Sequence, residues 1–236
     1  MARTVNQEEY AAKRNEIVAA AQQVIFTKGY AQMTIQDILD AVNISSGAFY
    51  HYFDSKPALL DALIEQIKQT TEEPLLPIIR DPRLPAIDKL RGFFSTLDRL
   101  RAAHRLDVIK LGRVWYGDAN ALIRQKVDEA VRRQRAPLLN EIVRQGIQEG
   151  VFTTAYPDQA GEIILCLLQG MGNAHAQLLL SVTQEGDAQS SIEGVVAVHA
   201  AYMDAIERVL GARPNSLYRV DAEAAKVWLD ASRDST

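Results

Sequence analysis

Cysteine is almost missing from this sequence: its 236 residues include a single cysteine, Cys166. An intramolecular disulfide is therefore excluded. Cys166 lies in the apolar run 163–168 with no base beside it in sequence. We therefore expect it to be a small core side chain and not a nucleophile.

Long apolar segments and strand patterns are also missing. No run approaches the roughly 18 uncharged apolar residues that a membrane helix needs, and the N-terminus is polar where a signal peptide has its apolar core. Alternating patterns typical of strands do not occur. These absences predict an all-α cytoplasmic protein with no membrane partner.

A surplus of basic residues is missing as well. The chain has 26 Lys and Arg against 30 Asp and Glu, a net charge of −4, and residues 1–56 carry five basic and six acidic side chains. A negative net charge does not suit a protein that binds nucleic acid without sequence selectivity. If the N-terminal segment binds DNA, it does so through individually placed contacts.

Motifs of metal, phosphate and acyl chemistry are not found. There is no His-x-x-x-His, Cys-x-x-Cys, glycine-rich phosphate loop or Gly-x-Ser-x-Gly turn. The four histidines, His51, His104, His175 and His199, are far apart in sequence. This spacing weakens a metal site without excluding one assembled by folding. We expect no cofactor and no catalytic residues. The alternative is an enzyme whose N-terminal helical segment has no part in its function.

Helical periodicity is what the sequence has in abundance. Apolar residues recur at three- and four-residue spacing up to Ile25, and Gly29 follows Lys28 as a left-handed cap. Thr34 with Asp37 predicts a capping box for a second, short helix. Ser45 or Ser46 caps a third helix up to residue 53, and Ser55 caps a fourth that begins at Lys56.

The rest of the chain predicts further helices. Four prolines within 73–85 mark a boundary at which the fourth helix ends, and Pro137 kinks or divides a later one. Residues 221–231 predict a weaker final helix that docks through Val227 and Trp228. The other segments with helical periodicity are 86–103, 105–116, 120–149, 158–180 and 191–210.

The second and third helices, joined by a tight turn, have the form that enters a DNA major groove. Gly47 and Ala48 let the helix end approach the bases, and Ser45 and Ser46 add hydroxyl donors. Phe49 and Phe53 are predicted core residues. For the aromatic run 50–52, the pattern leaves DNA contact and partial burial equally open.

This region resembles a known signature. The pattern is Thr34-Ile-x-x-Ile38, then Ala41-Val42-x-Ile44-Ser45-x-Gly47-x-Phe49-Tyr50-His51-Tyr52-Phe53-x-Ser55-Lys56-x-x-Leu59-Leu60. Over residues 14–60 the chain resembles the DNA-binding domain of the TetR family of transcriptional regulators. The resemblance implies an all-α fold with a three-helix helix-turn-helix domain over 1–56, a helical effector-binding and dimerisation domain over 57–215, and a tail over 216–236.

The resemblance also implies a function: a ligand-responsive repressor that binds a palindromic double-stranded DNA operator as a homodimer. A helix-bundle module that binds protein is the alternative. By position, Ser45, Ser46, Gly47 and Tyr50 would face bases and nearby backbone. Phosphates would be held by Thr34, His51, Tyr52 and Lys56.

The last two long helices are predicted to dimerise. Both are apolar on nearly every side, which favours half of an intermolecular four-helix bundle; filling the core of one protomer is the alternative. The predicted interface consists of Leu165, Leu168, Met171, His175, Leu179, Val195, Val198, Tyr202 and Ile206.

An unidentified small-molecule effector is the remaining predicted partner, because regulators of this family generally enclose a pocket. Candidates are polar or aromatic residues near apolar stretches. His175 also fits an ordinary core histidine, and Lys110 and Arg113 fit a solvated helix face. The candidates are His104, Lys110, Arg113, Trp115, Tyr116, Gln169, Asn173 and His175.

Overall fold

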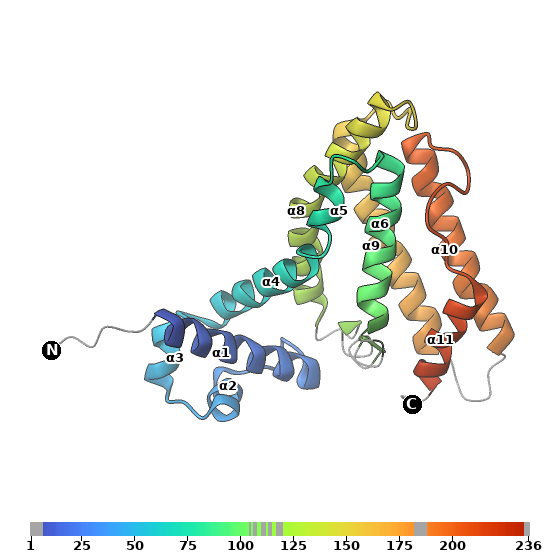
Figure 1. The fold of residues 1–236 in the computed structure, drawn as a ribbon. Helices are drawn as coiled ribbons and strands as arrows, with labels where there is room; N and C mark the ends of the chain where they lie inside the picture. Colours follow the sequence, from blue (N-terminus) through green and yellow to red (C-terminus); the bar gives the residue numbers. More distant parts are fainter. Residues whose placement is uncertain are drawn as a thin grey trace. The chain divides into compact units, whose positions relative to one another are not determined.

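The computed structural model describes residues 7–103, 105, 108–109, 112, 115–116, 120–181 and 188–233. These residues are helical and contain no strand, which confirms the predicted all-α class (Figure 1). The helices are α1 (Gln7–Lys28), α2 (Ile35–Val42), α3 (Ser46–Tyr52), α4 (Lys56–Glu72), α5 (Leu76–Arg80), α6 (Ala86–Ala103), α8 (Ala121–Gln148), α9 (Pro157–Ser181), α10 (Ala188–Leu210) and α11 (Ala222–Arg233).

The chain forms two compact units. Unit 1 comprises Met1–Thr70 and Val114–Val127, and unit 2 comprises Thr71–Arg113 and Asp128–Thr236. Helices α4 and α8 therefore each begin in unit 1 and end in unit 2. The sequence placed the first boundary after residue 56, whereas unit 1 also takes in most of α4 and the first turns of α8.

Local signals set the helix ends in unit 1 as predicted. Gly29 has a positive φ of 82° after α1, the left-handed conformation that glycine adopts without a steric penalty. The Ser55 hydroxyl accepts a hydrogen bond from the amide of Ala58 at 3.2 Å, which caps α4. Each of these contacts lies within one turn of helix.

Unit 2 has one main apolar core, built from α6, α8, α9 and α10. Phe93, Leu139, Ile164 and Met203 are among its buried members. Helices α8 and α9 approach so closely at Gly161 that an added Cβ would lie 2.3 Å from the carbonyl oxygen of Ala136. Only glycine fits there without moving the backbone.

The proline-rich segment and the middle of α8 differ from the expectation. Residues 76–80 form the short helix α5, with Pro77 in its first turn, where a missing amide costs nothing. Pro137 lies inside α8, which continues past it as one helix and is not divided. Six of the twelve residues of the predicted helix 105–116 lie outside the described residues.

Helix α11 confirms the predicted final helix but docks through other residues. Ala225 and Leu229 are buried, and they pack with Ile192 and Val195 of α10. Val227 and Trp228, the predicted contacts, are only partly buried. The Arg105 guanidinium lies over the Trp228 ring at 5.7 Å from its centroid.

Helix α9 corrects two expectations from the sequence. Residues Pro157–Leu180 are long and apolar enough to span a membrane, by length and composition alone. Helix α9 runs beside α10 in unit 2, and this packing buries part of its apolar surface (Figure 1). Cys166, expected in the core, is exposed because it lies on the outer side of α9.

The protomer core already contains much of the predicted dimer interface. Leu165, Leu168, Met171 and Ile206 belong to the main core of unit 2, and Val195 is buried with α11. Leu179 and Tyr202 pack against these clusters, His175 and Val198 are half-buried, and none of the nine residues is exposed. For these residues the alternative left open by the sequence holds, because their side chains fill the core of one protomer.

Candidate nucleic-acid interface

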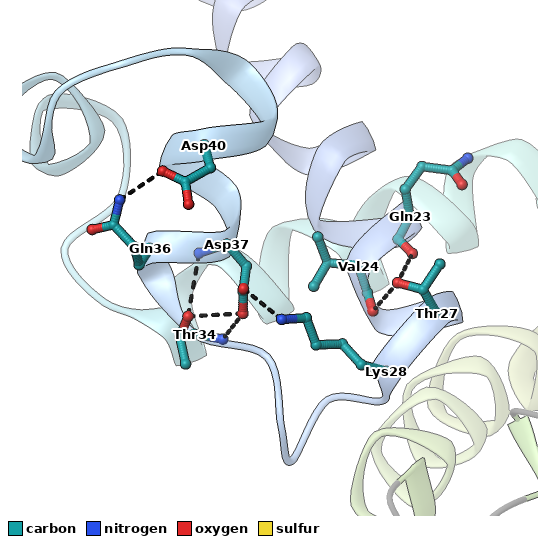
Figure 2. A network of polar contacts seen from close by, with 8 residues as sticks. All are labelled: Gln23, Val24, Thr27, Lys28, Thr34, Gln36, Asp37 and Asp40. Carbon is teal, nitrogen blue, oxygen red and sulfur yellow. Dashed lines mark hydrogen bonds and ion pairs between the residues drawn. The ribbon is translucent and has the colours of Figure 1, made fainter.

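A capping box fixes the start of α2, as the sequence predicted (Figure 2). The Thr34 hydroxyl accepts from the amide of Asp37 at 3.2 Å, and the Asp37 carboxylate accepts from the amide of Thr34 at 2.7 Å. The same carboxylate also accepts from the Thr34 hydroxyl. Thr34, a predicted phosphate contact, is exposed but already serves this cap.

An ion pair joins the end of α1 to the start of α2. Lys28, the last residue of α1, donates to the Asp37 carboxylate (Figure 2). The hydrogen bonds from Lys28 and from the Thr34 amide lower the pKa of Asp37 to about 2. Asp37 is therefore ionised at neutral pH. Its ion pair with Lys28 joins the two ends of the segment that connects α1 and α2.

The turn between α2 and α3 is equally well defined. Asn43 adopts the left-handed conformation, with φ 53°, and donates its amide to the carbonyl of Leu39. Ser45 is the N-cap of α3 and accepts from the amide of Ala48 at 3.2 Å. The two helices thus form a helix-turn-helix, which is the geometry that presents a recognition helix.

The outer side of α3 carries most of the predicted base-facing residues. Ser45, Ser46 and Gly47 are exposed, and Tyr50 has 50% of its surface exposed. An added Cβ at Gly47 would meet no atom within 4 Å, so this glycine leaves an open approach to the helix. On the inner side, Phe49 is fully buried, as predicted.

Tyr10 of α1, which sequence reasoning missed, holds the end of α3. Its ring lies against Tyr52, with centroids 4.8 Å apart, and meets His51 edge-on at 5.5 Å. Its hydroxyl donates to the carbonyl of His51 at 3.4 Å. His51 is exposed and Tyr52 is half-buried, so this packing orients the two predicted phosphate contacts.

Replacing Tyr10 with alanine is expected to weaken DNA binding about tenfold, because an aromatic pair contributes up to about 1.5 kcal/mol. Tyr10→Phe keeps both ring contacts and should remain within about twofold of wild type. Titration of a labelled duplex measures both variants, with circular dichroism to confirm folding. Equal binding by Tyr10→Ala and wild type would show that Tyr10 does not position α3.

Lys56, the remaining predicted phosphate contact, is engaged inside the protein. Its ammonium donates to the carbonyl of Tyr30 at 2.7 Å and lies over the Tyr30 ring at 4.4 Å from the centroid. Partial burial lowers the pKa of Lys56. In this arrangement the ammonium holds the connection between α1 and α2.

The predicted effector residues are divided between the units. His104, Lys110 and Arg113 lie outside the described residues. Trp115 and Tyr116 belong to unit 1, where Arg124 donates to the carbonyl of Trp115 at 2.6 Å and lies over the Tyr116 ring.

In unit 2, Gln169 is held between Arg132, which donates to it at 2.7 Å, and the Asp128 carboxylate, to which it donates. Asn173 is half-buried. The His175 ring stacks on that of His199, with centroids 5.9 Å apart and planes 4° from parallel. Burial lowers the pKa of His175, and that of His199 to about 4, so both are neutral at physiological pH.

Two family models match the chain. Residues 17–63 match "Bacterial regulatory proteins, tetR family", and residues 113–173 match "Tetracyclin repressor-like, C-terminal domain". The first range contains α2, α3 and the turn between them. The second contains all of α8 and most of α9.

Similar proteins agree with these matches. The transcriptional repressor KstR2 of Mycobacterium tuberculosis is 25% identical over 143 residues, which are 59% of this chain and 69% of that protein. The repressor NemR of Escherichia coli is 22% identical over 79% of this chain and 95% of its own. A solved SmeT–triclosan complex shares the fold, with a TM-score of 0.61 at 16% identity, over 89% of this chain and 97% of its own.

Proposed function

Because the chain belongs to the TetR family of bacterial regulatory proteins, we propose that it is a transcriptional repressor that binds a palindromic operator as a homodimer. A small-molecule effector releases it from DNA. Its site of action is the cytoplasm, and it acts by occupying DNA and not by catalysis.

The observation that carries this proposal is the outer side of α3. A short helix whose start is capped by Ser45 exposes Ser46, Gly47 and Tyr50, while Phe49 anchors it from inside. Hydroxyl groups and an aromatic ring on such a helix suit contact with bases, thymine methyl groups and phosphates. Since unit 1 carries no net positive charge, affinity depends on these contacts being made twice, once in each half-site.

The second copy docks on the outer side of α9 and α10. Only 17% of the most apolar stretch of α9 is buried within the protomer, although α9 carries no charged residue after Glu162. Ile163 is 41% exposed. Exposed small residues on α10 allow close approach of a partner helix. The proposed surface consists of Ile163, Cys166, Asn173 and Gln177 of α9 with Ala197, Ala200 and Ala201 of α10.

The effector binds in unit 2. The solved SmeT relative is a complex with triclosan, which supports a small-molecule site in this fold. His175 and His199 each bury an Nε2 atom that has no hydrogen-bond partner within the described part of the chain. A buried nitrogen without a partner costs about 1–3 kcal/mol, so a ligand that offers a donor there gains affinity.

Selection of duplexes from a random library with the purified protein tests the DNA-binding function. We expect an enriched palindrome with half-site centres about 10–10.5 base pairs apart, or a multiple of this spacing. Tyr50→Ala should weaken binding of the selected duplex about tenfold, by removing one base-facing contact in each half-site.

Tyr156→Ala is the matched control, because Tyr156 in unit 2 is 69% exposed and lies outside the helix-turn-helix. It should bind as wild type does. If no duplex is enriched even at low salt, where phosphate contacts are strongest, the protein is not a DNA-binding regulator.

A further inference from the structure

Both backbone polar groups of Tyr30, in the connection between α1 and α2, are hydrogen-bonded to side chains. Its amide donates to the side-chain oxygen Oδ1 of Asn120 at 2.8 Å, and its carbonyl accepts from the Lys56 ammonium at 2.7 Å. Asn120 is completely buried, with 0% of its surface exposed. Because a buried amide without an acceptor is costly, Tyr30 and Asn120 are held together firmly.

The two partners of Tyr30 lie at the starts of the two helices that pass from one unit to the other. Lys56 is the first residue of α4, and Asn120 directly precedes Ala121, the first residue of α8. The chain passes into unit 2 after Thr70 in α4 and after Val127 in α8. The backbone of a single residue of unit 1, Tyr30, therefore bonds to the starts of both helices.

The same two helices are joined again inside unit 2. Arg135 of α8, which is 8% exposed, donates to the Thr71 hydroxyl of α4 at 2.6 Å. The Glu72 carboxylate, next along α4, interacts favourably with the Arg135 charge. Helices α4 and α8 are thus linked to one another within each unit.

The connection that contains Tyr30 is coupled to the recognition segment. Tyr30 lies between Lys28 and Asp37, whose ion pair closes this connection (Figure 2). Met33 is buried, and Thr34 directly after it caps α2. The backbone of Tyr30 is therefore joined through this short segment to the start of α2, which leads into α3.

We propose that Asn120 is a coupling residue. Through Asn120, helix α8, like α4, transmits a conformational change of the effector-binding unit to the helix-turn-helix. This inference rests on the proposed function. When unit 2 changes conformation, displacement of α8 withdraws the acceptor from the Tyr30 amide and loosens the start of α2. Because coupling is reciprocal, DNA bound at α3 stabilises the first turns of α8.

Hydrogen exchange of the full-length protein, measured with and without the selected duplex, tests the coupling. In wild type, the duplex should slow exchange in residues 46–52 and also, by about tenfold, in residues 121–127. In Asn120→Ala, protection of 46–52 should remain, whereas protection of 121–127 should fall below about twofold. Asn120→Leu fills the same volume without the acceptor and should behave like Asn120→Ala, whereas Asn120→Asp keeps an Oδ acceptor and should behave like wild type.

Asn140→Ala is the matched control for loss of a buried asparagine. Asn140, also in α8, accepts from the amide of Gly161 at 2.7 Å in unit 2. This variant should keep protection at both segments. The inference is overturned if Asn120→Ala retains protection of 121–127, if wild type shows none there, or if Asn140→Ala loses it equally. Absence of protection at 46–52 in wild type would instead overturn the DNA-binding function.

Discussion

Ala201→Arg is expected to convert the dimer to monomers and to weaken operator binding on the order of 100-fold, because two linked half-site contacts become one. Ala201 is exposed on the outer side of α10, so a long cation there disturbs no contact within the protomer. At the proposed interface, the introduced guanidinium would lie near the guanidinium of the second copy, across the two-fold axis and within an apolar surface.

Sedimentation velocity and duplex titration measure the two effects of Ala201→Arg together. Ala222→Arg, which adds the same side chain at an exposed position of α11, is the control and should remain a dimer with wild-type affinity. Cys166 provides an independent readout, since its exposed thiol should be alkylated more slowly in the dimer than in the monomeric variant. A dimeric Ala201→Arg with full operator affinity would place the interface elsewhere.

Leu168→Glu is not a suitable test of the interface. Leu168 is 8% exposed and belongs to the main core of unit 2. A carboxylate buried there without a partner would unfold the protomer before it could report on the dimer.

Glu207→Ala is expected to lower the free energy of unfolding by about 3–5 kcal/mol, the usual cost of breaking a buried ion pair on one side. The Glu207 carboxylate, which is 1% exposed, accepts from the amides of Asn215 and Leu217, each at 2.9 Å. It also accepts from the Arg219 guanidinium at 2.7 Å. These contacts hold the segment that leads from α10 to α11.

Urea unfolding at one fixed protein concentration measures this loss, since stability of a dimer depends on concentration. Glu207→Gln keeps the shape but loses the charge, and should cost about 2 kcal/mol. Asp204→Ala is the control on the same helix: its pair with Arg208 is solvent-exposed, and its loss should cost less than about 0.5 kcal/mol. If Glu207→Ala and Asp204→Ala unfold at the same urea concentration, the buried carboxylate does not hold this segment.

The sequence alone determined most of the helices, several of their ends and the helix-turn-helix. Thr34 with Asp37, Ser45 with Ala48 and Ser55 with Ala58 act within one turn of helix, so neighbouring residues suffice to predict them. The inward position of Phe49 also followed from helical spacing. The short helix α5 was missed because its prolines fit both a helix start and a turn.

Only the tertiary structure decided which side of a uniformly apolar helix faces inward. In α9, periodicity could not tell Leu168 from Cys166, because apolar residues occur on every side; packing against α8 and α10 buried the first and exposed the second. The contacts that hold the helices of unit 1 together are also long-range. Tyr10 and His51 are 41 residues apart, and Tyr30 and Asn120 are 90 apart. Such pairs leave no periodic signal in the sequence, because folding alone brings their atoms within hydrogen-bond distance.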